Sequence, residues 1–168
     1  IRDVERSRGL GDVYKRQVYQ CRPDSLGHIH ARSSDPHEYP AINFNFLDVE
    51  SDRRCILDGV QMVRNLMNTT ALDAFRGAEE APGKDIQGDT AMLDWIRRTA
   101  ETTYHPTGTC RMGSTDRNVV DERLRVHGID GLRIADASIM PTLVSGNTNA
   151  ACLMIGEKGA DMVLEEAA

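Results

Sequence analysis

The sequence predicts an α+β fold, and three patterns along the chain support that prediction. Residues 41–46 alternate apolar and polar side chains, with the period of two that is typical of a half-buried strand. Segments that begin near Ser51 and near Asp89 repeat apolar residues with helical spacing instead. We therefore expect a strand unit followed by helices.

The strand unit is expected to be an antiparallel pair. Residues 26–33, LGHIHARS, can form the partner strand, and SSDPHEYP between the two strands has the prolines, aspartate and serines of a turn. In such a strand His28 and His30 point to the same face, which fits a metal pair or simple surface exposure equally well. The apolar face of the second strand is expected to carry Ile42, Phe44 and Phe46.

Three helices are expected after the strand pair. The first has an apolar stripe of Ile56, Val60, Val63 and Met67. The second has Asp89 or Thr90 as its N-cap, and its inward residues are Met92, Leu93, Ile96 and Ala100. The third, at the end of the chain, carries Gly156 and Gly159 on one narrow stripe with Cys152 and Ile155. Glycine weakens a helix by about 1 kcal/mol relative to alanine, so close packing is expected at both glycines.

Before this last helix, residues 132–135 are expected to form the apolar centre of a short strand.

Composition excludes several classes of protein. A net charge of -6 over 168 residues argues against a nucleic-acid partner, which needs clustered Lys and Arg. The chain shows no apolar run long enough for a membrane-spanning helix. Its four cysteines, in no metal-binding spacing, are expected to be reduced and mostly buried in an intracellular protein.

Residues 1–17 differ from the rest of the chain. They have no periodicity that joins the first strand, and SRGLGDVYKRQ resembles translated adaptor read-through at the end of an incomplete gene sequence. We therefore expect residues 1–17 to be a non-native tail.

Two polar stretches are candidates for function. In YHPTGTCRMG, residues 104–113, His105 precedes a proline and two glycines, and the residues alone allow a base, a metal ligand or a structural histidine. In PTLVSGNTNA, residues 141–150, polar residues precede the last helix. They can cap that helix, or its free N–H groups can bind an anion.

The order of these motifs resembles a known family. YHPTGTCRMG, then NVVDERLRVHGIDGLRIADASIMP, then SGNTNAACLMIGEKGADM are similar to the C-terminal signature of the glucose-methanol-choline (GMC) oxidoreductases, in their choline dehydrogenase-like branch. The resemblance covers about residues 22–165. It implies the C-terminal fragment of a two-domain FAD-dependent oxidoreductase whose N-terminal FAD-binding half, with its G-x-G-x-x-G turn, is missing.

The resemblance also implies a division of the chain. Residues 18–104 match part of an antiparallel-sheet substrate-binding domain. Residues 105–168 match the returning strand and helix of a Rossmann-like FAD-binding domain, with the active-site loops.

For the complete enzyme, the resemblance implies oxidation of a primary, choline-like alcohol to the aldehyde, with hydride transfer to flavin N5. His105 and Asn147 match the two catalytic positions: a neutral imidazole takes the hydroxyl proton, and the carboxamide donates to the same substrate oxygen. The positions that match cofactor contacts to FAD are Asp136, Ala137, Gly146, Thr148 and Asn149. No metal is implied.

Several alternatives stay open at this point. The enzyme can be an oxygen-using oxidase or a dehydrogenase of another alcohol, and the chain alone can be an inactive structural or binding module. Ala151 stands where relatives commonly have proline, which slightly weakens the assignment to choline.

The partners expected are a small alcohol and an electron acceptor that the residues do not identify. The expected location is cytoplasmic, or peripheral at the inner face of a membrane.

Overall fold

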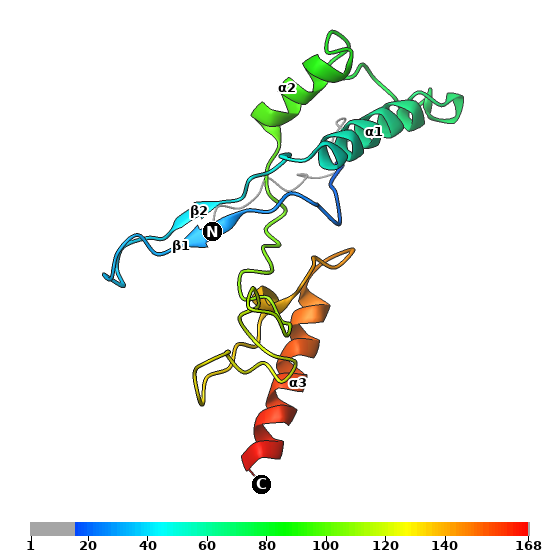
Figure 1. The fold of residues 1–168 in the computed structure, drawn as a ribbon. Helices are drawn as coiled ribbons and strands as arrows, with labels where there is room; N and C mark the ends of the chain where they lie inside the picture. Colours follow the sequence, from blue (N-terminus) through cyan, green and yellow to red (C-terminus); the bar gives the residue numbers. More distant parts are fainter. Residues whose placement is uncertain (1–15, 168) are drawn as a thin grey trace.

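A computed structural model describes residues 16–167. Figure 1 shows two groups of elements joined by an extended segment that precedes residue 108. The first group holds the strands β1 (His28–His30) and β2 (Ala41–Asn43), the helix α1 (Glu50–Met67), the short helix η1 (Thr70–Leu72) and the helix α2 (Asp89–Thr99). The second group holds the short helix η2 (Ala137–Ile139) and the helix α3 (Asn149–Ala167), with irregular loops around them.

The strand pair is antiparallel, as the sequence predicts, but shorter. Ile29 lies opposite Ile42, with His28 opposite Asn43 and His30 opposite Ala41. Asn45 has a φ of 52°, which leaves the β region and ends the second strand. Phe44 and Phe46 follow the strand and stack on each other, with ring centres 5.1 Å apart.

A small apolar core joins α1 to α2. Its buried members are Leu57 of α1 and Met92 and Ile96 of α2. The stripe predicted on the first helix is only half-buried, and of its residues Ile56 and Val60 pack against this core.

The start of α2 corrects the prediction for its cap. Gly88 is the N-cap residue and Asp89 is the first residue of the helix. The carboxylate of Asp89 instead pairs with Arg54 of α1 at 2.6 Å. Ala100 lies just beyond the helix and is exposed, not inward-facing.

Asp52 is the most buried charged side chain among the described residues, with 1% of its surface exposed. Its two oxygens accept hydrogen bonds from the backbone N–H groups of Asp24 (2.9 Å) and Ser25 (2.7 Å), and from the Gln20 amide (2.7 Å). Burial alone would raise the pKa of Asp52, but the hydrogen bonds from Ser25, Asp24 and Gln20 outweigh it and lower the pKa below its ordinary value. Asp52 therefore fastens residues 20–25 to the first turn of α1.

A second core lies under α3. Its fully buried residues come from the loops, from η2 and from α3, and they are Val120, Leu124, Ile139, Met140 and Ile155. Two arginines of the loops hold the far end of the helix, where Arg123 pairs with Glu165 at 3.0 Å and Arg133 pairs with Glu166. The hydrogen bond from Arg133, with a second one from Arg123, lowers the pKa of Glu166. The helix is thus fixed by apolar contacts along its length and by ion pairs at its C-terminal end.

The strand predicted at residues 132–135 is not formed. The second group contains only isolated bridges, such as Arg125 with Arg133 and Val120 with Val126. Residues 124–126 and 132–134 run antiparallel for only three residues, with hydrogen bonds from Val126 to Leu132 and from Ile134 to Leu124, and this contact is too short to form a strand. In the described part of the chain, the sheet of β1 and β2 is the only one.

The two helix glycines behave differently. A Cβ on Gly159 would lie 3.1 Å from the Cβ of Ala135 and 3.4 Å from Leu124, so close packing is confirmed there. Gly156 is exposed and a Cβ would meet nothing within 4 Å, so the prediction is wrong at that position.

The cysteines also differ from expectation. All four are free, but Cys21 and Cys55 are exposed and Cys110 and Cys152 are half-buried. The predicted tail at residues 1–17 falls almost entirely outside the described residues.

The Asp52 contacts lead to a prediction. Asp52→Asn places an amide donor against a backbone N–H donor, and we expect the exchange protection of the Asp24 and Ser25 amides to fall about tenfold or more. Since the folded pKa of Asp52 is lowered, its carboxylate stabilises the wild type above about pH 4, and this contribution is lost as the pH falls through the folded value. Hydrogen exchange between pH 3 and pH 7 measures both effects. The control is Asp58→Asn on the exposed side of α1, and equal loss of protection in both variants would contradict the prediction.

Candidate functional site

The site begins with two segments that backbone hydrogen bonds hold together. The N–H groups of Gly108, Cys110 and Met112 donate to the carbonyls of Ala137 (3.4 Å), Ser138 (2.9 Å) and Ile139 (2.8 Å), in that order. The donors are alternate residues of one segment and the acceptors are successive residues of the other. These three hydrogen bonds hold the loop that follows His105 against η2. Two predicted site segments, whose bonded residues are 27 to 29 positions apart in sequence, therefore lie side by side.

Gly108 is the first residue of this contact and has a backbone conformation that favours glycine. Its φ of 80° lies in the left-handed region, which a side chain rarely adopts. A Cβ at this position would also lie 3.2 Å from the carbonyl oxygen of Met140. Any other residue would therefore be strained and would press the loop away from η2.

His105 enters the site directly after an unusual turn. Tyr104 has a φ of 61°, although it is not a glycine, and its N–H donates to the hydroxyl of Thr102 at 3.1 Å. His105 is half-buried, and its ring makes no hydrogen bond to any of residues 16–167. Within the described chain, its ring nitrogens are available to a substrate.

Asp136 and Ala137 mark the start of η2. One carboxylate oxygen of Asp136 accepts a hydrogen bond from the N–H of Ser138 at 2.7 Å, so Asp136 is the N-cap residue of this short helix. Its side chain is otherwise exposed. Ala137 packs against the second core.

The second candidate loop leads into α3. The helix begins at Asn149, and the N–H of Cys152 donates to the carbonyl of Thr148 at 2.9 Å, which confirms the predicted start. Gly146 has a φ of 154°, and a Cβ there would meet nothing within 4 Å. Asn147 is exposed and has no side-chain hydrogen bond within residues 16–167.

The two loops share one support. Ala137 and Ala151 both pack against the second core, and α3 packs against η2. This arrangement brings the His105 loop close to Asp136 and Ala137, and it sets the start of α3 on the same core. No hydrogen bond joins His105 to Asn147 within the described residues.

The start of α3 is suited to an electron-rich edge of a flavin. The first turn of a helix leaves N–H groups without partners in the helix and carries partial positive charge. The open space around Gly146 allows a flat ring to approach the backbone there. Among the predicted cofactor residues, Asp136, Gly146 and Asn149 are exposed, whereas Ala137 and Thr148 are half-buried.

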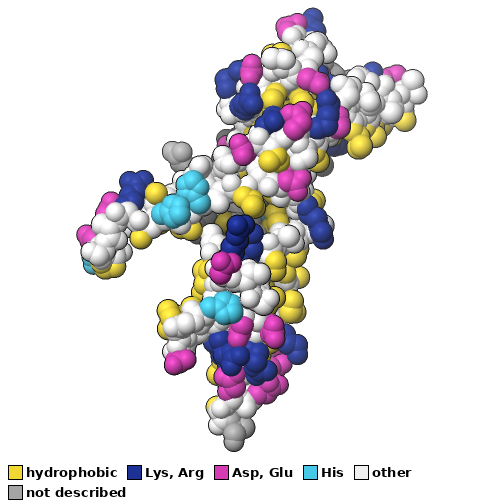
Figure 2. Space-filling view, in the orientation of Figure 1, with side chains coloured by type: hydrophobic (Ala, Val, Ile, Leu, Met, Phe, Trp, Pro, Cys, Tyr) yellow, Lys and Arg dark blue, Asp and Glu magenta, His cyan; other side chains and the backbone are white. Residues whose placement is uncertain are grey.

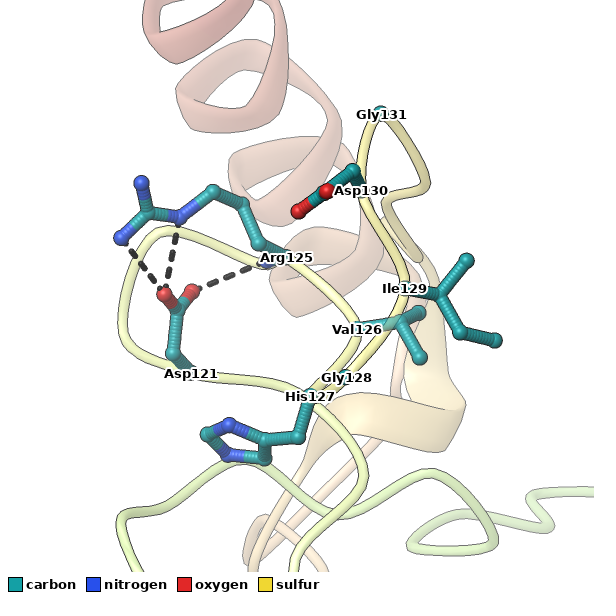
Figure 3. Close-up of a pocket in the computed structure, with 8 residues that line it drawn as sticks. All are labelled: Asp121, Arg125, Val126, His127, Gly128, Ile129, Asp130 and Gly131. Carbon is teal, nitrogen blue, oxygen red and sulfur yellow. Dashed lines mark hydrogen bonds and ion pairs between the residues drawn. The ribbon is translucent and has the colours of Figure 1, made fainter.

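A shallow hollow lies elsewhere in the second group (Figure 3). It has a volume of about 250 Å³, and one wall is the ion pair of Asp121 with Arg125 at 2.8 Å. None of the predicted site residues lines it. His127, which does, bonds through its Nε2 to the carbonyl of Gly113 at 2.9 Å. This hollow is formed by a turn, and His127 is engaged by the backbone.

Two kinds of feature are missing from residues 16–167. No group of three or more His, Cys, Asp or Glu side chains in this range is placed to hold a metal ion. No helix within the same residues has the length and apolar character needed to cross a membrane.

Comparison with known proteins decides the family. The sequence profile of the GMC oxidoreductases matches residues 23–156, which include His105, η2 and the start of α3. The chain belongs to the GMC oxidoreductase family. FAD is the cofactor of this family.

Individual relatives agree with this assignment. The chain is 48% identical over 150 residues to an oxygen-dependent choline dehydrogenase of Cronobacter sakazakii, a match that covers 86% of this chain and 27% of that protein. Among solved structures, pyridoxine 4-oxidase from Mesorbium loti matches with a TM-score of 0.78 and 33% identity, over 84% of this chain and 28% of that one. Formate oxidase from Aspergillus oryzae, in its R554A form, matches with a TM-score of 0.78 and 31% identity, over 84% and 25%. The chain thus spans about a quarter of the length of the GMC proteins that it matches.

Sequence reasoning missed one residue that shapes the site. Arg22, whose Nε donates to the hydroxyl of Ser145, ties the second loop to the N-terminal segment from 123 residues away. A contact at that separation leaves no local pattern in the sequence.

The capping role of Asp136 can be tested directly. Asp136→Ala removes the acceptor for the Ser138 N–H and should cost about 1 kcal/mol, which is roughly a fivefold loss of exchange protection at the Gly108, Cys110 and Met112 amides. Asp136→Asn keeps an acceptor oxygen and should retain most of that protection. Hydrogen exchange measured by mass spectrometry provides the comparison. Unchanged protection in the alanine variant would show that Asp136 does not hold these two segments together.

Proposed function

We propose that this chain supplies the catalytic loops of an FAD-dependent enzyme that oxidises a primary, choline-like alcohol to the aldehyde. The observation that carries the proposal is the row of backbone hydrogen bonds between residues 108–112 and 137–139, which holds the segment after His105 beside a predicted cofactor contact. Family membership supports the reaction class, and the identity to choline dehydrogenases supports the substrate class.

In this proposal His105 handles the hydroxyl proton of the alcohol. A neutral imidazole nitrogen can accept that proton near neutral pH, where histidine is suited to general base catalysis. The ring has no competing hydrogen bond within residues 16–167, so the substrate does not have to displace a protein partner. FAD, when bound, accepts the hydride from the carbon of the alcohol.

Asn147 is proposed to orient the same alcohol oxygen. Its amide nitrogen can donate a hydrogen bond but cannot take the proton under these conditions, so it does not compete with His105. Its exposure at the start of α3 leaves both amide hydrogens available. A donor placed there stabilises the negative charge that develops on the oxygen as the proton leaves.

The residues proposed to hold the cofactor lie on both segments. Asp136 and Ala137 are proposed to contact FAD from η2, while Gly146, Thr148 and Asn149 line its approach at the start of α3. The free N–H groups of that first helical turn favour an anionic edge of the cofactor. Exposed positions at Asp136, Gly146 and Asn149 support this assignment.

The candidate functions that remain differ in their electron acceptor or in their alcohol substrate. The relative from Cronobacter sakazakii is described as oxygen-dependent, and the similar solved structures include oxidases. We favour a choline-type dehydrogenase, with the oxidase and the dehydrogenase of another alcohol as the competing functions. A location in the cytoplasm, with or without peripheral attachment to a membrane, is part of the same proposal.

The role of His105 leads to a kinetic prediction. In a complete enzyme that carries this chain, His105→Ala should slow anaerobic flavin reduction about 100-fold or more, because a general base is lost. The flavin content should stay close to that of the wild type. Stopped-flow absorbance of the flavin gives the rate, and the absorbance of released flavin gives the content. His127→Ala, which removes the bond to Gly113, is the control and should affect folding instead of the rate. Parallel loss of flavin and rate in His105→Ala would assign His105 a structural role.

The substrate class has its own test. A panel of alcohols, with choline included, is mixed anaerobically with the complete enzyme, and the rate of flavin reduction is recorded for each. We expect choline or a similar primary alcohol to reduce the flavin fastest. Reduction by none of the alcohols would overturn the proposed function, whereas preference for a different alcohol would replace only the substrate.

A further inference from the structure

We propose that His28 and His30 form a surface site for a divalent transition-metal ion such as Cu²⁺. The two residues lie two apart on β1, so their side chains leave the same face of the strand. Their ring centres are 4.9 Å apart and the ring planes are inclined by 34°. The site is separate from the proposed catalytic residues, none of which lies on the hairpin.

The spacing of the rings suits one shared metal ion. A metal about 2 Å from a ring nitrogen lies about 3 Å from the centre of that ring, so two imidazoles in neighbouring coordination positions have centres about 4.5 to 5 Å apart. The observed 4.9 Å falls within that interval. Two rings can therefore bind one ion with no movement of the strand backbone.

The surroundings of the pair leave room for an ion. Ala41, directly opposite His30, has only a methyl group. Asn43, opposite His28, uses its side-chain oxygen to accept the N–H of Asn45 at 3.0 Å. Both histidines are exposed, and Figure 2 shows histidine side chains gathered on the outer surface of the hairpin.

The opposite face of the hairpin explains why the pair faces water. Ile29 and Ile42 lie opposite each other on the other side of the strands, and Phe44 continues that apolar side. When one face of a two-stranded unit is covered, the apolar one is buried. The histidine face is then the one left to water.

The chemistry of the donors selects the metal class. Neutral imidazole nitrogens bind copper, nickel and zinc, and affinity across the divalent ions is highest for Cu²⁺. No third His, Cys, Asp or Glu joins the pair within residues 16–167, so water completes the coordination. The site is thus an open one with two protein ligands.

The test uses Cu²⁺ as the probe and the complete, flavin-containing enzyme as the protein. Isothermal titration should give one site, and the electron paramagnetic resonance spectrum should show two nitrogen ligands. His28→Gln and His30→Gln should each weaken binding about 100-fold, because either change removes the chelating pair. The matched control is His37→Gln, an exposed histidine in the turn of the same hairpin, which should bind Cu²⁺ as the wild type does.

Two outcomes would overturn the site. One is unchanged Cu²⁺ affinity in both His28→Gln and His30→Gln, and the other is an equal loss in His37→Gln. The flavin absorbance of each variant confirms that it is folded, so a failure of metal binding is distinguishable from a failure of the enzyme.

Discussion

A row of backbone hydrogen bonds between two distant segments is the constraint on which the candidate site depends. Peptide groups of residues 108–112 donate to carbonyls of residues 137–139, and the second core lies beneath both. These bonds use only backbone groups, while Ile139, Ala137 and Met112 of the same segments pack in or against the second core. Since Ile139 and Met140 are buried at the end of η2 and directly after it, the position of the His105 loop is tied to the packing of α3.

The two groups of elements obtain their stability in different ways. The first has a core of three buried apolar residues and depends on a charged side chain, Asp52, to attach the segment that precedes the hairpin. The second has a larger core and ion pairs at the end of its helix. Several large apolar side chains remain exposed in both groups, including Phe44, Phe46, Leu153 and Leu164. Exposed apolar surface of this kind is typical of a face that binds another protein segment or a partner.

Sequence patterns predicted the elements better than their ends and contacts. Periodicity located the hairpin, the three helices and the start of α3, because each depends on residues close together in the chain. The predicted N-cap of α2 was wrong because Arg54, 35 residues away, draws the carboxylate of Asp89 into an ion pair.

Gly156 and Gly159 look alike in the sequence, but only Gly159 faces Ala135. The strand expected at residues 132–135 needs a partner that runs beside it, and the loops of this chain give it only isolated bridges. For the candidate site, motif order proposed the residues, while the bonds that bring two of their segments together left no trace in the side-chain pattern.

Gly108 shows how sequence variation would act on this protein. It carries no reactive group, yet its backbone angle and its closeness to the carbonyl of Met140 make any residue with a side chain strained there. A substitution at Gly108 would therefore disturb the backbone of the loop that follows His105, although it removes no functional group. A ranking of positions by chemical reactivity alone would misjudge which codons of this loop tolerate change.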